Sequence, residues 1–484
     1  MTRSPQFDAA VQIVEKLRSH GFEAYLAGGC VRDLLLGREP VDYDVATSAT
    51  PDVVLEMFPR TFAVGAHFGV VLVASETGAG CGDGLVAERC VTEVATFRSD
   101  GIYSDGRHPD EVRYTKTARE DVQRRDFTIN GLLLDPLVLS ETRKAGPSTS
   151  AADATFAQDD TTNGSVRSAV FDYVGGLADL DEGIIRAIGE PGRRFEEDHL
   201  RLLRAVRFAA RFGFALESQT AAAMRALAGR IHAVSRERVR DELTKMLTEG
   251  KARRAFELLD ETGLLAQVLP EVAKMKGVEQ PPQFHPEGDV WIHTLMLLEQ
   301  LAPGCELTLA WGALLHDVGK PPTFRVAPDR IRFDGHVEVG VAISADICRR
   351  FRFSNDDTRQ ILALVENHMR FADAPRMRAS TLKRFFRLDN FPEHLDLHRM
   401  DCLAAHANLD IYNFVREAHA SMPEESMRPR PLLTGRELIA AGYTPGPQFK
   451  PMLRAVEDAQ LEGAITTPEE ALVLVRERFG ASGS

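Results

Sequence analysis

The chain has 484 residues, of which 44% are hydrophobic and 27% charged, and its formal net charge is −13. This length predicts two to four domains with a sizeable buried core, and the composition is that of an ordinary soluble globular protein. The negative charge argues against a non-specific nucleic-acid binder, whose affinity depends on broad phosphate neutralisation, but it is compatible with an RNA enzyme that carries a local basic stripe.

The sequence also predicts the compartment. No run of about 18 apolar residues occurs, so we expect no membrane span, and the short polar segment Met1 to Phe7 lacks a signal-peptide core. None of the six cysteines belongs to a C-x-x-C pair, which argues against a zinc knuckle and against a disulfide framework. These features predict a cytoplasmic protein.

The first third of the chain alternates short strand and helix patterns. Residues 8–20 carry apolar side chains at helical spacing, and a second helical stretch, 31–36, follows Gly28-Gly29. Residues 25–27 are a short apolar run. The runs that we interpret as strands are 42–46, 70–74 and 111–115, and residues 127–134 are interpreted as a buried strand or the helix beside one. This mixture over residues 20–175 predicts a small α/β head with a mixed sheet.

Three segments interrupt this pattern. Residues 78–84 are predicted to form a surface hairpin or loop, and residues 93–107, with two glycines and mixed charges, are predicted to be mobile. Residues 140–168 are rich in Ser, Thr, Ala and Asp, cannot bury enough surface to order themselves, and are predicted to be a flexible insertion. From Glu196 onward the pattern predicts a mostly α-helical body.

A glycine pair and two aspartates form the first candidate site. Gly28-Gly29 at a helix start lets the backbone approach a phosphate, and Arg32 in the first turn could reach the same anion. Asp42 and Asp44 are two residues apart, which on a strand places both carboxylates on one face. Beside a triphosphate they could hold two Mg²⁺, which would activate an attacking hydroxyl and stabilise the leaving pyrophosphate. A lone glycine pair is usually a turn and a lone D-x-D a solvated strand edge, so their order and spacing favour catalysis.

Five ordered sequence blocks carry a resemblance to a known family. They are GGCVRD at 28–33, DYD at 42–44, RRDFTIN at 124–130, DYVGG at 172–176 and EDHLRLLRAVRF at 197–208. Together, over residues 20 to 270, they resemble the class II tRNA nucleotidyltransferase and bacterial poly(A) polymerase branch of the polymerase β-like nucleotidyltransferases.

This resemblance implies a reaction and the residues that perform it. The implied reaction is template-independent addition of CCA to the 3′ end of tRNA from CTP and ATP, with Asp42 and Asp44 as catalytic ligands of two Mg²⁺. The residues that the resemblance places at the nucleotide are Gly28, Gly29, Arg32, Asp33, Arg125, Asp126, Asn130, Asp198, Arg201 and Arg204.

Asp198 and Arg201 are the candidates for base selection. Their i, i+3 spacing within the predicted helix 196–211 places them on one face. Cytosine and adenine each present an amino donor beside a ring-nitrogen acceptor, which a carboxylate and a guanidinium complement, whereas uracil and guanine present the wrong groups. In the resembling family this pair selects CTP and ATP. The alternative is a salt bridge on a solvated face.

Two neighbouring features keep their alternatives open. Arg204, Arg207 and Arg211 form a basic stripe that could follow RNA phosphates or bond to neighbouring acidic residues. Residues 93–107 lie where family members that complete the A-adding step carry a flexible loop, which argues against an enzyme restricted to adding C.

A second constellation begins after Pro281. In chain order it consists of His285, His293, His316, Asp317, His336, His368 and Asp401. Adjacent His and Asp with remote histidines can bind one or two divalent metals through nitrogen and oxygen, and a bound metal would turn a water into a nucleophile toward a phosphate ester. His285 is ambiguous because HPEG could be only a loop, and His394, His398 and His406 are interpreted as surface or core residues.

This order, with WIHTL at 291–295 and LLHDVGKP at 314–321, resembles the HD phosphohydrolase superfamily. The resemblance implies an all-α HD domain that holds a divalent transition metal, of unidentified element. The implied ligands are His293, His316, Asp317, His336, His368 and Asp401. Phosphodiesterase action on a 2′,3′-cyclic end is the most natural role beside an RNA-repair head, although the sequence does not identify the substrate.

The C-terminal tail resembles the nucleotidyltransferase family again. LLTGREL at 432–438, PGP at 445–447 and QLEG at 460–463 predict a helical tail that binds the tRNA elbow region, with Phe449-Lys450 in place of the small residue usual there.

The predicted domains are the head at 1–175, a helical neck that binds RNA and nucleotide at 176–280, the HD domain at 281–425 and the tail at 426–484. Three other functions stay open: a poly(A) polymerase, an enzyme that adds only CC or only A, and an HD hydrolase or nucleotide sensor with an inactive head. The short, weakly basic tail argues against the first, and the intact Asp42 and Asp44 argue against the last. The oligomeric state is not indicated.

Overall fold

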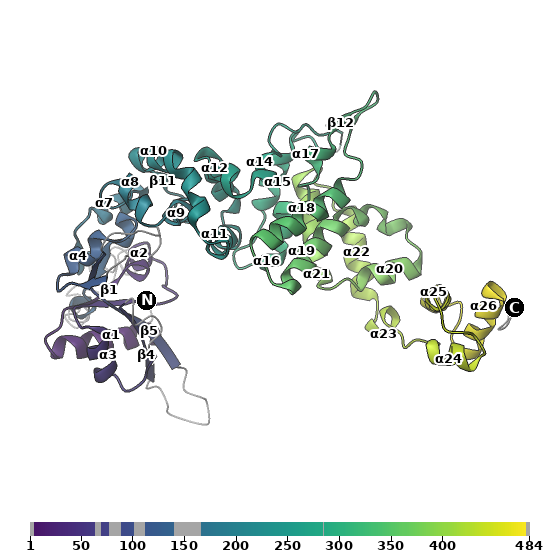
Figure 1. Ribbon diagram of the computed structural model, residues 1–484, viewed down its shortest axis with the longest axis horizontal. Helices are drawn as coiled ribbons and strands as arrows, with labels where there is room; N and C mark the ends of the chain where they lie inside the picture. Colours follow the sequence, from purple (N-terminus) through teal and green to yellow (C-terminus); the bar gives the residue numbers. More distant parts are fainter. Residues whose placement is uncertain are drawn as a thin grey trace, which may run out of the picture. The chain divides into compact units, whose positions relative to one another are not determined.

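The computed structural model describes residues 4–62, 69–76, 89–100, 112–139, 166–283 and 285–480. The chain divides into two compact units, each of which can be followed by colour in Figure 1. The first consists of Met1–Glu242 with Glu257–Val268, and the second of Leu243–Phe256 with Leu269–Ser484. Within the described ranges, no helix combines the length and the apolar character that crossing a membrane requires. The finer division into four domains stays a prediction.

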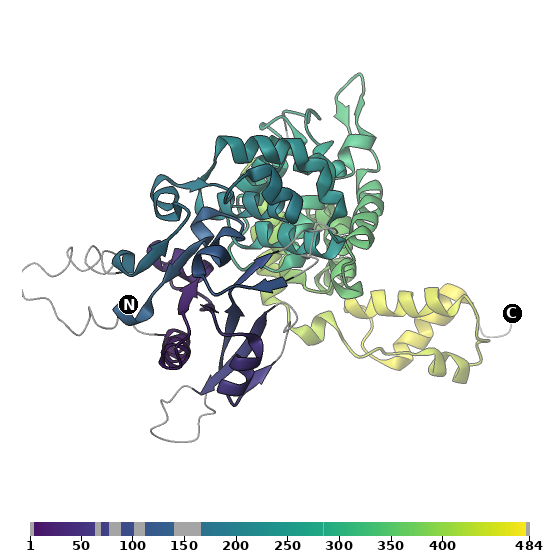
Figure 2. The same ribbon diagram turned by 60° about the vertical axis from the view of Figure 1, so that its left-hand side comes forward.

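A seven-stranded mixed sheet is the centre of the first unit (Figure 2). Its strand order is β3-β4-β5-β2-β1-β8-β9; β2 and β5 run parallel and the other neighbours run antiparallel. The strands are β1 (Ala24–Ala27), β2 (Val45–Thr47), β3 (Thr61–Phe62), β4 (Val70–Glu76), β5 (Arg89–Thr96), β8 (Leu132–Leu134) and β9 (Val170–Asp172). A separate antiparallel pair consists of β6 (Arg98–Asp100) and β7 (Val112–Tyr114).

Short helices cover this sheet. They are α1 (Pro5–Ser19), α2 (Gly29–Leu35), α3 (Pro51–Met57), α4 (Ala118–Gln123), the 3₁₀ turn η2 (Thr128–Asn130) and α7 (Gly176–Glu182). The longest of them, α1, begins after Ser4, whose hydroxyl accepts the Phe7 amide as an N-cap. Its apolar positions Ile13, Val14 and Leu17 are buried, so the helix predicted at 8–20 is confirmed.

Two expectations about the head are corrected. The strand predicted at 42–46 begins only at Val45, because its neighbour β1 ends at Ala27, where Gly28 takes a positive φ of +75° and turns the chain away. The segment predicted to be mobile at 93–107 contains the end of β5 and all of β6. Its remaining residues, 101–107, lie outside the described residues, as do 78–84 and 140–165. Residues 166–168 of the predicted insertion are helical, and Val166 is buried.

The chain then becomes mostly helical. The elements that follow are β10 (Ile184–Ile185), α8 (Pro191–Glu197), α9 (Arg201–Phe212), β11 (Ala215–Leu216), α10 (Ser218–Leu227), η3 (Ala228–Ala233), α11 (Arg236–Thr248), α12 (Ala252–Glu261), α13 (Leu264–Val268) and α14 (Pro270–Ala273). The single helix predicted over 196–211 is wrong: the backbone is extended at Asp198, with φ −144° and ψ 105°, so α8 and α9 are separate helices.

The HD region of the second unit is helical apart from one hairpin. Its elements are α15 (Val290–Leu298), α16 (Leu307–Leu315), α17 (Lys320–Thr323), the hairpin strands β12 (Arg325–Val326) and β13 (Ile331–Arg332), α18 (His336–Arg350), α19 (Asn355–Asn367), η4 (His368–Arg376), α20 (Ala379–Phe386), α21 (Phe391–Ala404) and α22 (Asp410–Ser421). Helix α16 is buried almost throughout, which places its C-terminal His316 and the following Asp317 in the interior.

The tail has a small core of its own. Its helices are α23 (Glu424–Met427), α24 (Gly435–Ala440), α25 (Phe449–Leu461) and α26 (Pro468–Phe479). Thr434 and Glu437 form a reciprocal capping box, which explains the T-x-x-E spacing within LLTGREL as a helix start. Phe449 packs over Gly435, where a Cβ would lie 3.6 Å from its ring, so the bulky residue is accommodated.

Candidate functional site

The glycine pair of the head stands where β1 turns into α2. Gly28 requires glycine for two reasons: its φ is positive, and a Cβ would lie only 2.9 Å from Nη1 of Arg125. The guanidinium of Arg32 is buried and donates to Asp33 Oδ1 at 2.8 and 2.9 Å and to Asn130 Oδ1 at 2.5 Å. The turn therefore lies directly against the RRDFTIN segment, whose Asn130 is 98 residues further along the chain than Arg32.

Three carboxylates gather beside this turn. Burial first, and then the negative charges of Glu93 and Asp42, raise the pKa of Asp44 to about 7, although Arg125 opposes them. Burial and Asp42 also raise the pKa of Glu93. The acidic groups thus repel one another, and Arg125 does not outweigh the combined effect of this repulsion and of burial at Asp44, which is the chemistry of a divalent-cation site.

Glu93 is a site residue that the sequence analysis missed. Strand β5 runs parallel to β2 with Val94 beside Val45, so Glu93 occupies the position next to Asp44. The available signal was an acidic residue within the otherwise apolar strand CVTEVATF. It was overlooked because the segment was interpreted as a mobile loop.

A buried carboxylate orients the two arginines of RRDFTIN. Asp121, 2% exposed, accepts hydrogen bonds from Arg124 at 2.7 and 2.9 Å and from Arg125 at 3.1 and 3.4 Å. Burial favours its neutral form, but the two guanidinium groups outweigh that effect and lower its pKa. Asp121 was also absent from the predicted site.

Asp126 connects the same segment to α9. Its Oδ1 accepts from the Phe127 amide and from Asn130 Nδ2, and its Oδ2 accepts from Arg204 at 2.6 and 2.9 Å. Burial disfavours the carboxylate, but Arg204 and these hydrogen bonds outweigh it and lower the pKa of Asp126. The structure therefore joins Asp33, Arg32, Asn130, Asp126 and Arg204 in one polar network.

The D-x-x-G-G turn packs against η2, which carries Asn130 of this network. Asp172 accepts four backbone amides, those of residues 174–177, at 2.9–3.0 Å. A Cβ on Gly176 would lie 2.2 Å from the carbonyl oxygen of Thr128, so only glycine allows this turn to pack against η2.

The side chains of the two predicted base-selecting residues have different partners, although the Arg201 amide donates to the Asp198 carbonyl at 3.0 Å. Nη1 of Arg201 donates to Glu197 Oε2 at 2.7 Å and to the Arg194 carbonyl, and Nη2 donates to the Arg124 carbonyl. Asp198 instead accepts from Arg238 at 2.9 Å. The expected shared helix face is absent because α8 ends before Asp198.

Two residues of the basic stripe have acidic partners. Arg204 pairs with Asp126, and Arg207 pairs with Glu242 at 2.7 Å, with both side chains of the second pair less than 10% exposed. Arg211 lies over the ring of Phe212.

The six predicted HD ligands converge in the second unit. Four histidines are oriented alike: each Nδ1–H donates to an oxygen, namely Glu287 for His293 and the carbonyls of Ala313, Phe333 and Val365 for His316, His336 and His368. Every Nε2 lone pair is therefore directed away from these oxygens, which is how metal-binding histidines are held.

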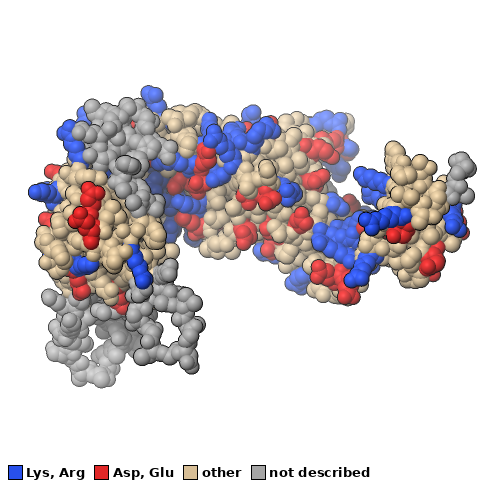
Figure 3. All heavy atoms as spheres, turned by 60° about the horizontal axis from the view of Figure 1, so that its bottom comes forward, with Lys and Arg blue, Asp and Glu red and all other residues tan. Residues whose placement is uncertain are grey.

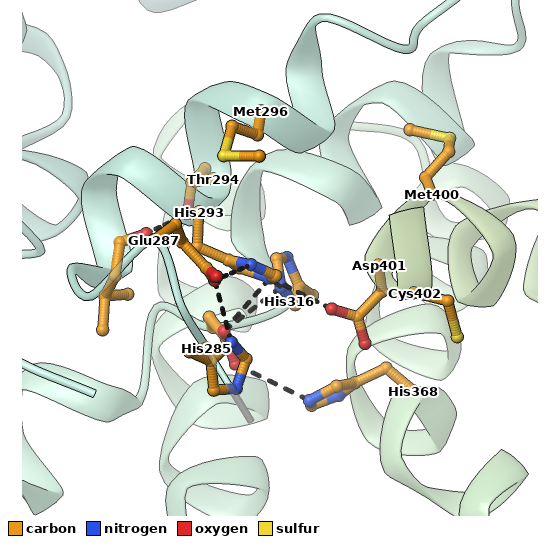
Figure 4. A network of polar contacts seen from close by, with 12 residues as sticks. His285, Glu287, His293, Thr294, Met296, His316, His368, Met400, Asp401 and Cys402 are labelled. Carbon is orange, nitrogen blue, oxygen red and sulfur yellow. Dashed lines mark hydrogen bonds and ion pairs between the residues drawn. The ribbon is translucent and has the colours of Figure 1, made fainter. Parts of the chain in front are cut away.

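These ligands form two triplets. His293 Nε2 lies 3.0 Å from Asp401 Oδ1 and 3.3 Å from His316 Nε2, and Asp317, His336 and His368 form the second triplet. Asp317 faces both: Oδ2 lies 3.2 Å from His316 Nε2, and Oδ1 lies 3.7 Å from His368 Nε2. Such spacings suit ligand atoms that share an ion about 2.1 Å from each, and two ions could share Asp317. Figure 4 shows the His293 ring between Glu287 and Asp401.

The electrostatics of this centre fit a cation. Burial lowers the pKa of His368 to about 4, and its Nε2, like that of His336, has no hydrogen-bond partner among the described residues. Burial also disfavours charged His293, but hydrogen bonds to Asp401 and Glu287 outweigh it and raise its pKa to about 9. A metal ion would take the place of that proton and satisfy the unpaired nitrogens.

The HPEG segment contributes Glu287, which the sequence analysis missed. Its Oε1 accepts from His293 Nδ1 at 2.7 Å and from His285 Nδ1 at 2.9 Å, so His285 contacts the centre only through Glu287. Lys320 is a further buried partner, 2.7 Å from Asp317 Oδ2. His394 and His398 are buried elsewhere, with His398 stacked on Phe371, and His406 is exposed.

The tail lies beside a cleft of about 1010 Å³, lined by residues 429–435 and α25. Its wall includes the basic residues Arg384, Lys450 and Arg454, and Figure 3 shows Lys and Arg side chains gathered on one face of the C-terminal part of the second unit. Arg384 also holds α20 against α25 by pairing with Glu457 at 2.7 Å.

Three family models match the chain in order. They are "Poly A polymerase head domain" over residues 24–186, "Probable RNA and SrmB- binding site of polymerase A" over 213–276 and "HD domain" over 289–406.

Known proteins extend this likeness along the chain. The CCA-adding enzyme of Geobacillus thermodenitrificans is 38% identical over 270 residues; the match covers 56% of each protein, so the chain spans about half the length of such relatives. The crystal structure of the Bacillus stearothermophilus CCA-adding enzyme with CTP covers 98% of both chains, with 26% identity and a TM-score of 0.68. The A-adding tRNA nucleotidyltransferase of Deinococcus radiodurans is 33% identical over 473 residues, which cover 94% of this chain and 95% of that protein. Because this last likeness extends along nearly the whole of both proteins, the chain belongs to the tRNA nucleotidyltransferase family.

Proposed function

We propose that this protein rebuilds the CCA end of tRNA, adding nucleotides from CTP and ATP to the 3′ hydroxyl without a nucleic-acid template. The observation that carries the proposal is the polar network that ties Arg32, Asn130, Asp126 and Arg204 together beside the carboxylates of the head. The A-adding tRNA nucleotidyltransferase of Deinococcus radiodurans, which matches 94% of this chain, supports the same reaction class. The proposed partners are tRNA, CTP and ATP, and the proposed compartment is the cytoplasm.

In this scheme, Asp42 and Asp44 would hold two Mg²⁺, and the charge of Glu93 would act on them from its place beside Asp44. When bound, Mg²⁺ supplies Lewis-acid chemistry to the attacking hydroxyl and to the leaving pyrophosphate. The chain's own part is to bring Asp42 and Asp44, which precede β2, together with Glu93 of β5. It also places Arg125 beside Asp44 and Arg32 beside the glycine turn, where the guanidinium groups could bind phosphate oxygens.

Base selection is assigned to Asp198 and Arg201. The carboxylate would accept the amino group of cytosine or adenine, and Arg201 would donate to the ring nitrogen. To do so, Arg201 must exchange its bond to Glu197 for the base, because Nη1 is now 2.7 Å from Glu197 Oε2.

Base selection is tested with Asp198→Ala. We expect UTP and GTP to be incorporated, with discrimination lowered by about 1–3 kcal/mol, or roughly 5- to 150-fold. Asp241→Ala is the matched control, because that exposed carboxylate pairs with its neighbour Arg240. An unchanged nucleotide preference with a collapsed rate would make Asp198 a structural residue.

Product lengths decide which nucleotides are added. Transcripts lacking CCA, CA or A would be incubated with CTP and ATP singly and together. A full enzyme completes all three; an A-adding enzyme, like the Deinococcus radiodurans relative by its name, extends only the last. Ladders longer than three nucleotides with ATP alone would indicate a poly(A) polymerase.

A second activity is proposed for the HD region: metal-dependent hydrolysis of a phosphate ester such as a 2′,3′-cyclic end. The supporting observation is the common orientation of the four Nε2 atoms around Asp317 and Asp401. Each triplet contains two histidine nitrogens, and imidazole ligands favour a transition metal over Mg²⁺. The test is elemental analysis and hydrolysis of 2′,3′-cyclic nucleotides with Mg²⁺, Mn²⁺, Ni²⁺ or Co²⁺; protein that retains no transition metal would contradict the proposal.

We also propose the four-part division of this enzyme. Residues 1–175 would be the catalytic head, 176–280 the neck, 281–425 the HD domain and 426–484 the tRNA-binding tail.

A further inference from the structure

Asp198 occupies a break in the backbone, and that break leaves its orientation to side-chain contacts. Helix α8 ends at Glu197 and α9 begins at Arg201, so the extended Asp198 belongs to neither helix. A residue within a helix projects its side chain in a direction that the helix fixes. At Asp198, neither α8 nor α9 fixes the direction of the side chain.

Two donors hold the carboxylate instead. The Leu200 amide donates to Oδ1 at 3.0 Å, and Nη2 of Arg238 donates to Oδ2 at 2.9 Å. Each carboxylate oxygen can accept a second hydrogen bond. The side chain of Asp198 is 18% exposed, so the group is fixed and still accessible to a ligand.

Helix α11 holds Arg238 in place. One turn further along this helix, Glu242 pairs with Arg207 of α9 at 2.7 Å, and both of these side chains are buried. Residues at i and i+4 share a helix face. One face of α11 therefore carries both Arg238, which binds Asp198, and Glu242, which binds Arg207 of α9. These two contacts fix the position of α11 relative to the backbone break at Asp198.

We propose that Arg238 is a positioning residue for nucleotide selection: it holds the Asp198 carboxylate in the orientation that accepts the amino group of cytosine or adenine. This inference rests on the proposed role of Asp198. Without Arg238, the nearest alternative cation along the chain is Arg201, three residues away. If Asp198 paired with Arg201, the carboxylate could no longer accept the amino group of the base, and the guanidinium could no longer donate to its ring nitrogen.

The test compares Arg238→Gln with Arg240→Gln. Arg240 lies on the same helix and pairs with Asp241, and its side chain is 26% exposed against 27% for Arg238, so it is a matched loss of charge. The measurement is kcat/KM for CTP, ATP, UTP and GTP on tRNA transcripts that lack CCA, together with the melting temperature. We expect Arg238→Gln to lower the CTP:UTP and ATP:GTP ratios about tenfold, Arg238→Lys to restore part of the loss, and Arg240→Gln to retain the wild-type ratios.

Asp198→Ala and the double variant separate this inference from the proposed function. If Arg238 acts through Asp198, Arg238→Gln changes no ratio further once Asp198 is Ala. If Asp198→Ala relaxes selection but Arg238→Gln lowers every kcat/KM equally, Arg238 is merely structural and the inference is wrong while the proposed function stands. If Asp198→Ala leaves selection intact, the base-selecting role fails and the inference fails with it.

Discussion

The carboxylates of the head and the ligands of the HD region are held in different ways. In the HD region, each of the four predicted histidine ligands has its Nδ1–H fixed by an oxygen. The six predicted ligands form two groups of three, and within each group the ligand atoms lie within 4.8 Å of one another. In the head, burial and the charges of Glu93 and Asp42 raise the pKa of Asp44, and burial and Asp42 raise the pKa of Glu93. These three carboxylates are nevertheless not among the described residues that gather three ligand atoms this closely.

This difference indicates two modes of metal use. The HD ligands are ordered before an ion arrives, which suits a resident metal. The head lacks that order, and Mg²⁺ is commonly bound by one or two carboxylates together with substrate phosphates. We therefore expect the head site to be completed by the triphosphate, and the HD site to be complete without substrate.

The largest expected effect is the loss of nucleotide addition in variants of the head, which variants of the HD region should not show. Asp42→Ala or Asp44→Ala should lower nucleotide addition by at least about 1000-fold, because a lost metal ligand removes several kcal/mol of transition-state stabilisation. His316→Ala with Asp317→Ala should retain addition near the wild-type rate. Single-turnover addition to tRNA lacking CCA measures both. A folded HD variant that loses addition would show that the two sites are coupled.

Removing the HD ligands should abolish the resident metal. His316→Ala with Asp317→Ala takes a ligand from each triplet, so we expect no transition metal to remain after dialysis, and no hydrolysis of 2′,3′-cyclic nucleotides. Elemental analysis compares the metal content of this double variant with that of Asp42→Ala, which should keep the metal of the HD region. Equal metal loss in both variants would mean that the sites are not independent.

Glu93→Gln tests the carboxylate that tertiary structure adds to the head. We expect addition to fall about 10- to 100-fold, the range that partners of metal ligands give, with a raised Mg²⁺ requirement. The reason is its place beside Asp44, where its charge acts on the same ion. Mg²⁺ titrations of the addition rate measure the change, and Glu76→Gln at the far end of β4 is the control. A rate and Mg²⁺ dependence like those of the wild type would remove Glu93 from the site.

The smallest effect concerns the outer partner of the HD site. Glu287→Gln should weaken metal binding about 10- to 100-fold, because Glu287 fixes the ring of His293. His285→Gln should have a smaller effect, since His285 reaches the centre only through Glu287. Metal titration of the apo-protein measures both affinities. If His285→Gln weakens binding more than Glu287→Gln does, His285 is itself a ligand.

Short sequence blocks were sufficient to predict those parts of the protein whose functional residues lie close together along the chain. The D-x-D pair, RRDFTIN and the ordered histidines indicated the head, the family and the HD region, and all six predicted HD ligands meet in the structure. The mixed sheet and the helical body were also predicted, because the spacing of apolar residues indicates which side of a strand or helix is buried, and turn residues indicate where the element ends.

Tertiary structure alone decided which distant residues complete each site. Glu93 joins Asp44 through the parallel register of β5 and β2, and Arg238 reaches Asp198 from a helix forty residues away. The break at Asp198 was hidden because a helical pattern continues through it on both sides. Spacing along the chain specifies neighbours within one strand or helix, whereas strand register and helix packing depend on how the whole core is filled, so no local pattern contains them.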